Sequence, residues 1–204
     1  MAVVLAGSAW LSVVAVGTLA LVGYQSTPGR AESAPSEWPP NCGLRSRPDL
    51  PQLLMFAHPR CPCTRSSIGE LARLMTQCQG KLTATVLFYQ PEDAPDDWPH
   101  TDLWNSAEMI PGVSVRADVK GVEAQRFGAA TSGHVVLYDR FGGLRFRGGI
   151  TAARGHFGDN VGRSAIVSIL RSAGGDAINT PVFGCDLLGS PRGGTLGERP
   201  CPQP

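Results

Sequence analysis

The chain has 204 residues, with 18 Lys or Arg against 17 Asp or Glu and a formal net charge of +1. This balance supplies no strong electrostatic field for a polyanion, which argues against nucleic acid as a partner. The 25 Gly and 17 Pro residues make up about a fifth of the chain, where about an eighth is usual, so the composition predicts many turns and excludes a long helical bundle.

The first 24 residues carry no charged side chain. Residues 2–22 are apolar, and at about 1.5 Å per residue they reach about 30 Å, the thickness of a bilayer's hydrocarbon core. The length of this run and the lack of a basic segment before it favour an uncleaved anchor over a cleaved signal peptide. We therefore assign residues 1–24 to a transmembrane anchor or uncleaved signal, and the Pro-rich residues 25–49 to a linker.

The first part of the soluble region is predicted to be a strand-helix-strand unit. Residues 53–57 are a short continuous apolar run bounded by prolines, as expected of a buried central strand. Apolar residues at three- and four-residue steps predict an amphipathic helix over residues 64–79. The β-rich residues 82–89 then form a second strand, parallel to the first because a helix connects the two.

The next segment, residues 91–102, is acidic, and we interpret it as a solvated insertion on the surface. Periodicity and turn residues then predict, in chain order, a helix over 103–110, a strand over 113–119, a helix over 122–127, an antiparallel hairpin over 134–146 and a helix that starts at Asn160. These elements place one domain at residues 50–188. Residues 189–204 are rich in Gly, Pro and polar residues, and we expect a disordered tail there.

The chain contains six cysteines, which suit an oxidising compartment or a redox or metal-binding task. Their pairing is open, since six thiols allow 15 full pairings. Cys78 lies on the apolar face of the predicted helix and is interpreted as a small buried hydrophobe. Cys42 and Cys201 lie in Pro-rich flanks and could form a disulfide with each other.

The Cys61-Pro62-Cys63 motif follows the first strand and opens the first helix. A cysteine at this position faces unpaired backbone N–H groups and the positive end of the helix, which favours its thiolate. Arg60 and Arg65 add positive charge nearby. Pro62 suits the first helical turn, where its missing N–H would have no partner.

The chain resembles the thioredoxin-like superfamily in residues 56–63 and the following helix, and in residues 117–128 and 135–143, which occur in the family's order. The resemblance covers about residues 50–170. It is closest to the membrane-anchored TlpA and ResA type and to RedB-type proteins, the last also through residues 155–160 and 180–185. It implies an α/β fold, a three-layer α/β/α sandwich with a central mixed sheet, plus an N-terminal transmembrane helix. It further implies a bacterial inner-membrane protein with its soluble domain in the periplasm.

Two positions depart from the family pattern. Thioredoxins keep two residues between their cysteines, and the register from Phe56 puts Cys61 at the attacking position and Thr64 at the resolving one. Cys63 is therefore one place early. The family's cis-proline, which faces the disulfide, corresponds to Gly133.

Three chemical outcomes follow for the site. In the first, Cys61 attacks a disulfide of a cysteine-containing protein or small thiol, and Cys63 or the distant Cys185 resolves the mixed disulfide, with no cofactor required. A Cys61–Cys63 bridge would be strained and hence oxidising. In the second, Cys61 reacts with a peroxide, assisted by Thr64. In the third, the two thiolates hold Cu(I).

The leading hypothesis is a thiol-disulfide oxidoreductase with Cys61, Cys63 and Thr64 as catalytic residues. The alternatives are a copper(I) carrier and a peroxiredoxin-like thiol peroxidase, and Cys-Pro-Cys could also be a purely structural pair. We expect four further residues to line the cleft: His58, Pro62, Gly133 and His134. The two histidines are also the candidate third copper ligands.

Overall fold

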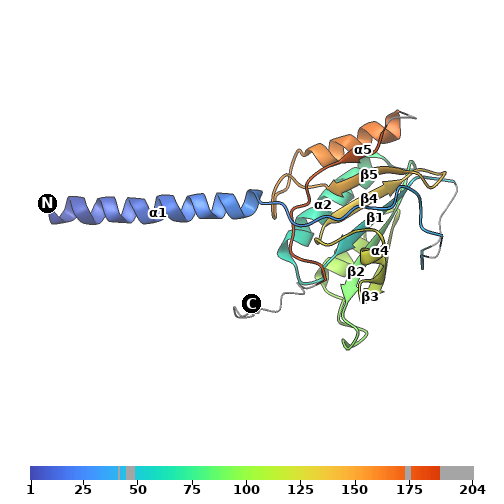
Figure 1. Cartoon of the computed structure of the whole chain (residues 1–204), viewed down its shortest axis with the longest axis horizontal. Helices are drawn as coiled ribbons and strands as arrows, with labels where there is room; N and C mark the ends of the chain where they lie inside the picture. Colours follow the sequence, from blue (N-terminus) through green and yellow to red (C-terminus); the bar gives the residue numbers. More distant parts are fainter. Residues whose placement is uncertain (41, 45–48, 173–175, 189–204) are drawn as a thin grey trace.

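The computed structural model describes residues 1–40, 42–44, 49–172 and 176–188 (Figure 1). The predicted tail over residues 189–204 and the pairing of Cys42 with Cys201 lie outside the described residues.

A six-stranded sheet forms the centre of the soluble domain, in the order β3-β2-β1-β4-β5-β6. Its strands are β1 (Gln52–Ala57), β2 (Thr83–Gln90), β3 (Val113–Val119), β4 (His134–Tyr138), β5 (Leu144–Gly149) and β6 (Ile178–Asn179). Strands β1, β2 and β3 are parallel, whereas β4 is antiparallel to both β1 and β5. The predicted mixed sheet is confirmed. The sequence did not predict β6, because two exposed residues are too few to show a period.

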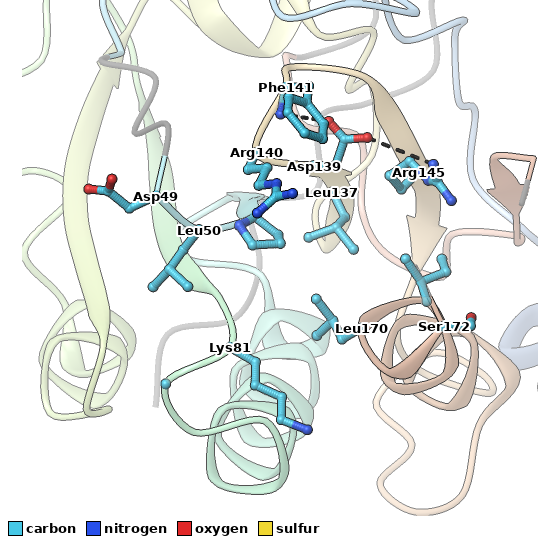
Figure 2. Close-up of a pocket in the computed structure, with 13 residues that line it drawn as sticks. Asp49, Leu50, Lys81, Leu137, Asp139, Arg140, Phe141, Arg145, Leu170 and Ser172 are labelled. Atoms are coloured by element: carbon cyan, nitrogen blue, oxygen red, sulfur yellow. Dashed lines mark hydrogen bonds and ion pairs between the residues drawn. The ribbon is translucent and has the colours of Figure 1, made fainter. Parts of the chain in front are cut away.

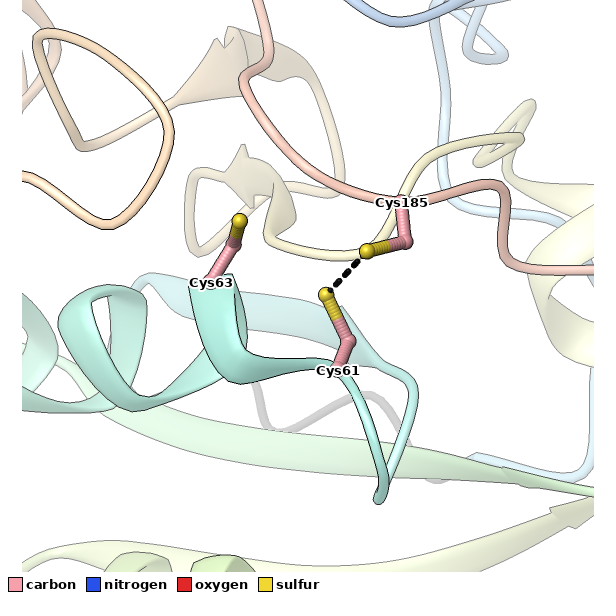
Figure 3. Close-up of side chains that lie close together, drawn as sticks. All are labelled: Cys61, Cys63 and Cys185. Atoms are coloured by element: carbon pink, nitrogen blue, oxygen red, sulfur yellow. Dashed lines mark hydrogen bonds between the residues drawn. The ribbon is translucent and has the colours of Figure 1, made fainter. Parts of the chain in front are cut away.

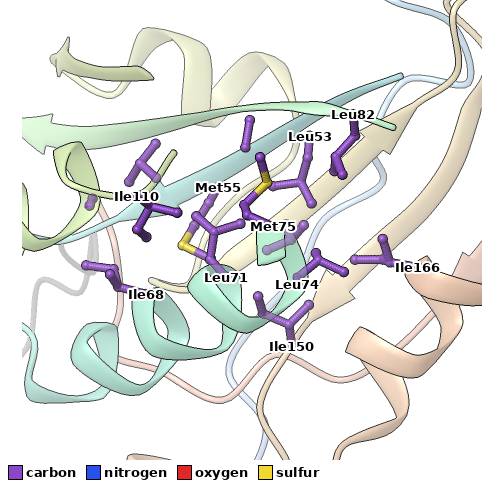
Figure 4. Close-up of a cluster of buried hydrophobic side chains, with 14 of the residues drawn as sticks. Leu53, Met55, Ile68, Leu71, Leu74, Met75, Leu82, Ile110, Ile150 and Ile166 are labelled. Atoms are coloured by element: carbon purple, nitrogen blue, oxygen red, sulfur yellow. The ribbon is translucent and has the colours of Figure 1, made fainter. Parts of the chain in front are cut away.

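Helices cover both faces of this sheet. They are α2 (Pro62–Gln77), α3 (Asp102–Glu108), α4 (Val122–Arg126) and α5 (Val161–Arg171). Side chains of β1 alternate between two cores: Leu53 and Met55 pack with α2 and α5 (Figure 4), whereas Leu54 and Phe56 pack on the α4 side. The α/β/α sandwich is therefore confirmed, and so is the burial of Cys78, which belongs to the first core.

Helix α1 (Ala2–Ser26) extends away from the domain as a single long rod (Figure 1). Its window Val3–Ser26 has a mean hydropathy of 2.0 and none of it is buried. The helix is long and apolar enough to cross a membrane, and an N-terminal signal sequence has the same properties.

The segment expected to be a linker packs in part against the domain. Trp38 contacts the rings of Phe127 and Tyr138 edge to face, with centroids 5.5 and 5.3 Å apart. The Tyr138 hydroxyl donates to the carbonyl of Pro35 (2.8 Å), and Glu37 forms a β-bridge with Gly143. Because α4 is only five residues long, this segment supplies much of the cover for the second core.

Candidate active site

Cys61 lies where the sequence placed it, between the end of β1 and the start of α2. It is the N-cap residue of α2, and Pro62 occupies the first helical position. The Cys61 N–H donates to the carbonyl of His58 (3.2 Å), and the Cys61 carbonyl accepts from the N–H of Thr64 (3.0 Å). The helix begins at Pro62, two residues before the predicted start, and has no side-chain cap.

Cys185 is brought to this junction by a segment that we call the C-terminal strap, residues 180–188. The strap pairs with the loop before β4: the N–H of Ser132 donates to the carbonyl of Cys185 (2.8 Å), and Thr131 forms a β-bridge with Asp186. Gly184 makes this close approach feasible, because a Cβ there would lie 1.9 Å from the carbonyl oxygen of Ser132. The strap therefore has a defined register on the domain.

Three sulfurs meet at this point. The Sγ atoms of Cys61 and Cys185 are 2.8 Å apart (Figure 3), and those of Cys61, Cys63 and Cys185 all lie within 4.8 Å of one another. Cys61 and Cys63 are 3% and 8% exposed, so both are shielded from solvent. The sequence pointed to the first two cysteines through their motif, but only to Cys185 as a distant candidate.

Comparisons with known proteins agree on the fold alone. Neither protein-family models nor curated proteins match the chain. A hypothetical protein of Sinorhizobium meliloti 1021 is 20% identical with a TM-score of 0.56, over 82% of this chain and 99% of its own. An uncharacterized conserved protein of Geobacillus kaustophilus is also 20% identical, with a TM-score of 0.58 over 83% of this chain and 92% of its own.

The deciding observation is where the cysteine lies in the sheet topology. Parallel β1 and β2 are joined through α2, β4 lies antiparallel on the other side of β1, and Cys61 caps α2 after this central strand. The chain therefore has a thioredoxin-like fold. The thioredoxin-like domain thus places Cys61 at the position that the resemblance assigned to the attacking cysteine.

The pKa values of the three thiols separate within this cluster. Hydrogen bonds from Cys185 and from Cys63 hold the pKa of Cys61 well below its ordinary value, against burial, which raises it. Hydrogen bonds with Cys61 and with Cys63, together with burial, raise the pKa of Cys185. The pKa of Cys63 is raised overall: the hydrogen bond with Cys185 lowers it, but the hydrogen bond with Cys61 and burial together outweigh that effect. Cys61 is therefore the thiolate of the cluster.

Thr64 of the thioredoxin-like domain is buried and holds the loops around the thiols in place. Its hydroxyl donates to the carbonyl of His58 (3.1 Å) and shares a hydrogen bond with the hydroxyl of Ser132 (2.8 Å). Ser132 in turn accepts from the N–H of His58 (2.8 Å). In its described hydrogen bonds, the Thr64 hydroxyl is therefore paired with oxygen atoms and not with a cysteine sulfur.

Neither predicted histidine belongs to the group of sulfurs. The His58 ring stacks on Tyr89 at 6.0 Å and meets Trp98 at 5.6 Å, and burial lowers its pKa. His134 is fully buried in β4, and neither ring nitrogen has a hydrogen-bond partner in the described part of the chain. Burial, aided by the charge of Arg147, lowers the pKa of His134 to about 4, so its ring is neutral at pH 7.

Gly133 stands where the resemblance places a cis-proline. Its φ is +90°, a conformation that favours glycine, and its N–H donates to the carbonyl of Phe56 (2.8 Å). All described peptide bonds are trans. The N–H of Gly133 thus links the loop before β4, which pairs with the strap, to the end of β1 near the thiols.

A cavity of about 540 Å³ lies elsewhere in the thioredoxin-like domain (Figure 2). Its lining includes Pro51, which precedes β1, and Asp139, which follows β4. Cys61 follows the other end of β1, so the cavity and the thiols lie at opposite ends of this strand. The candidate active site is therefore the sulfur cluster.

Proposed function

We propose that this protein is a thiol-disulfide oxidoreductase in which Cys61 is the nucleophile and Cys185 the resolving thiol. The observation that carries the proposal is the 2.8 Å separation of their sulfurs at the N-terminus of α2. In the same proposal, α1 anchors the protein in a bacterial inner membrane and the domain works in the periplasm on cysteine-containing proteins. An oxidising compartment suits a chain with six cysteines.

The reaction runs in two exchanges. The Cys61 thiolate attacks one sulfur of a substrate disulfide, forms a mixed disulfide and releases the other substrate sulfur as a thiolate that takes up a proton. Cys185 then loses its proton and attacks the Cys61 sulfur, which releases the second substrate thiol and leaves a Cys61–Cys185 disulfide. Two electrons pass to the substrate, and an external dithiol must return them.

Cys185 replaces Cys63 as our proposed resolving thiol for a geometric reason. The strap holds the Cys185 sulfur directly against that of Cys61, whereas a bridge between Cys61 and Cys63 would span one intervening residue and be strained. The RedB-type assignment belongs to this proposal too. It is supported by the fact that residues 180–185, part of that resemblance, belong to the strap.

Three single measurements on the full-length protein test this function. With a disulfide-bonded peptide substrate, Cys61→Ser should abolish exchange and keep the circular dichroism spectrum of the fold. Cys185→Ser should accumulate the mixed disulfide, since the second exchange lacks its thiol. Peptide mapping of the oxidised protein should find Cys61 bonded to Cys185.

Two results would contradict the proposal. Unchanged turnover of Cys61→Ser would show that Cys61 is not the nucleophile. A Cys61–Cys63 disulfide in the oxidised protein would show that Cys185 is not the resolving thiol. Hydrogen peroxide consumption faster than peptide exchange would favour the peroxidase alternative.

A further inference from the structure

The proposed exchange uses Cys61 and Cys185 and assigns no role to Cys63, the third thiol of the cluster. Yet Cys63 is buried, with the residue 8% exposed, and its sulfur lies within 4.8 Å of both other sulfurs. Cys63 belongs to the first turn of α2 and Cys185 to the strap, so two distant parts of the chain converge on the same point as Cys61 (Figure 3).

The geometry of the three sulfurs suits a three-coordinate ion. In a planar site with metal–sulfur distances of about 2.3 Å, the sulfurs lie about 4 Å apart. The sulfurs already meet within 4.8 Å, and only the 2.8 Å pair of Cys61 and Cys185 has to open. Opening this pair to about 4 Å takes a movement of about 1 Å at Cys185.

The donor set decides which ion fits. Thiolates select soft ions such as Cu(I), whereas Mg²⁺ and Ca²⁺ require oxygen ligands. The described group contains three sulfurs and neither a carboxylate nor a histidine. A structural Zn²⁺ site takes four protein ligands, one more than this group offers. Monovalent copper is thus the ion that matches both the number and the softness of the donors.

Positive charge beside the cluster offsets the charge of a thiolate site. The guanidinium of Arg154 donates to the carbonyl of Gly184, next to Cys185, and its charge acts on Cys63. The positive end of α2 points at Cys61. Together these groups compensate part of the net negative charge that three thiolates and one Cu⁺ would carry.

We propose that Cys61, Cys63 and Cys185 form a three-sulfur site that binds one Cu(I) ion when the protein is reduced. Binding forms three copper–sulfur bonds and releases the thiol protons to solvent, and no electron is transferred. A Cys61–Cys185 disulfide removes two of the three ligands, so oxidation excludes the metal. This inference goes beyond the proposed exchange, which does not use Cys63.

A titration of the reduced full-length protein in detergent micelles with Cu(I), in competition with a chromogenic Cu(I) chelator, tests the site. The wild-type protein should take up one equivalent, and X-ray absorption should show sulfur ligands only. Cys63→Ser should weaken binding by more than the about 10–100-fold loss typical of outer-shell partners. Cys42→Ser, a half-buried cysteine outside the cluster, should bind as the wild type does.

The redox chemistry of the same variant separates the two proposals. On oxidation, Cys63→Ser should still form the Cys61–Cys185 disulfide by peptide mapping. If it forms this bond and the wild-type protein binds no Cu(I), the copper site is disproved and the exchange reaction stands. Binding that survives Cys63→Ser, a nitrogen ligand in the absorption spectrum, or tighter binding of Zn²⁺ would also overturn the copper site.

Discussion

In the proposed exchange, the ionisation of Cys61 determines how the reaction responds to pH. Hydrogen bonds from Cys185 and Cys63 lower its pKa, whereas burial raises the pKa of Cys78 in the core. We expect the iodoacetamide reaction of Cys61 to be independent of pH around neutrality and to slow only well into acid, where the thiolate becomes protonated. Cys78 should react only in alkali.

Peptide mass analysis after timed alkylation follows both thiols in one sample. Cys185→Ala removes the strongest of the hydrogen bonds and should move the midpoint for Cys61 to higher pH. A wild-type midpoint at the ordinary pKa of a free thiol would refute this explanation.

At the scale of single residues, the conformation of Gly133 also leads to a prediction about stability. Its φ is +90°, and an added Cβ would lie 2.7 Å from the Ser67 hydroxyl oxygen. Gly133→Ala should therefore lower the free energy of unfolding by about 1–3 kcal/mol in urea titrations. Gly155, with φ +68° and nothing within 4 Å of an added Cβ, is the matched control for backbone strain alone. An equal loss in Gly155→Ala would mean that the contact with Ser67 adds nothing.

At the scale of elements, a buried carboxylate joins α2 to the segment that starts α5. Glu70 is fully buried and forms ion pairs with Arg163 (2.7 Å) and Arg73 (3.0 Å). It also accepts from the side chain of Asn160 (3.2 Å) and the N–H of Gly158 (2.9 Å). The helix predicted to start at Asn160 is α5, and Asn160 is its N-cap: the Asn160 side chain accepts from the N–H of Arg163 (2.7 Å). This network orients the helix that carries Cys61.

Glu70→Ala should lower the free energy of unfolding by about 3–5 kcal/mol, because it leaves the buried partners of the carboxylate unpaired. Glu108→Ala, at an exposed position at the end of α3, should change it by less than about 0.5 kcal/mol. Chemical denaturation of both variants provides the measurement. Similar values for the two would show that the network contributes little.

At the scale of the whole molecule, the N-terminal segment is part of the domain's core. Trp38 packs on two buried aromatic rings, whereas Phe141 is 82% exposed. Trp38→Ala should therefore lower the free energy of unfolding by about 2–3 kcal/mol, and Phe141→Ala by far less. Thermal or chemical unfolding of the full chain measures both. A negligible effect of Trp38→Ala would return residues 25–49 to the role of a free linker.

The end of α1 lies beside the thiols. The N–H of Arg154 donates to the carbonyl of Gln25 (3.0 Å), and its guanidinium lies over the Tyr24 ring, 4.9 Å from the centroid. The same guanidinium binds the strap at Gly184. Helix α1 extends away from the domain (Figure 1), and with α1 as the proposed anchor these contacts would hold the candidate active site on the side of the domain nearest the membrane.

The order and type of nearly all strands and helices followed from the sequence alone. Those signals are local: the apolar run of β1, the three- and four-residue steps of α2, and the Asn160 cap each depend on neighbours along the chain. The placement of Cys61 at a strand-to-helix junction followed for the same reason. The two-residue strand β6 was missed because it has no local pattern.

What only the tertiary structure decided is which groups surround that cysteine. Cys185 lies 124 positions away from Cys61, and its approach depends on the backbone pairing of the strap with Thr131 and Ser132. Likewise, the packing of Trp38 depends on an apolar face that α4 is too short to cover. Such contacts between distant segments are selected by burial and hydrogen bonding across the folded domain, so no local spacing in the sequence could specify them.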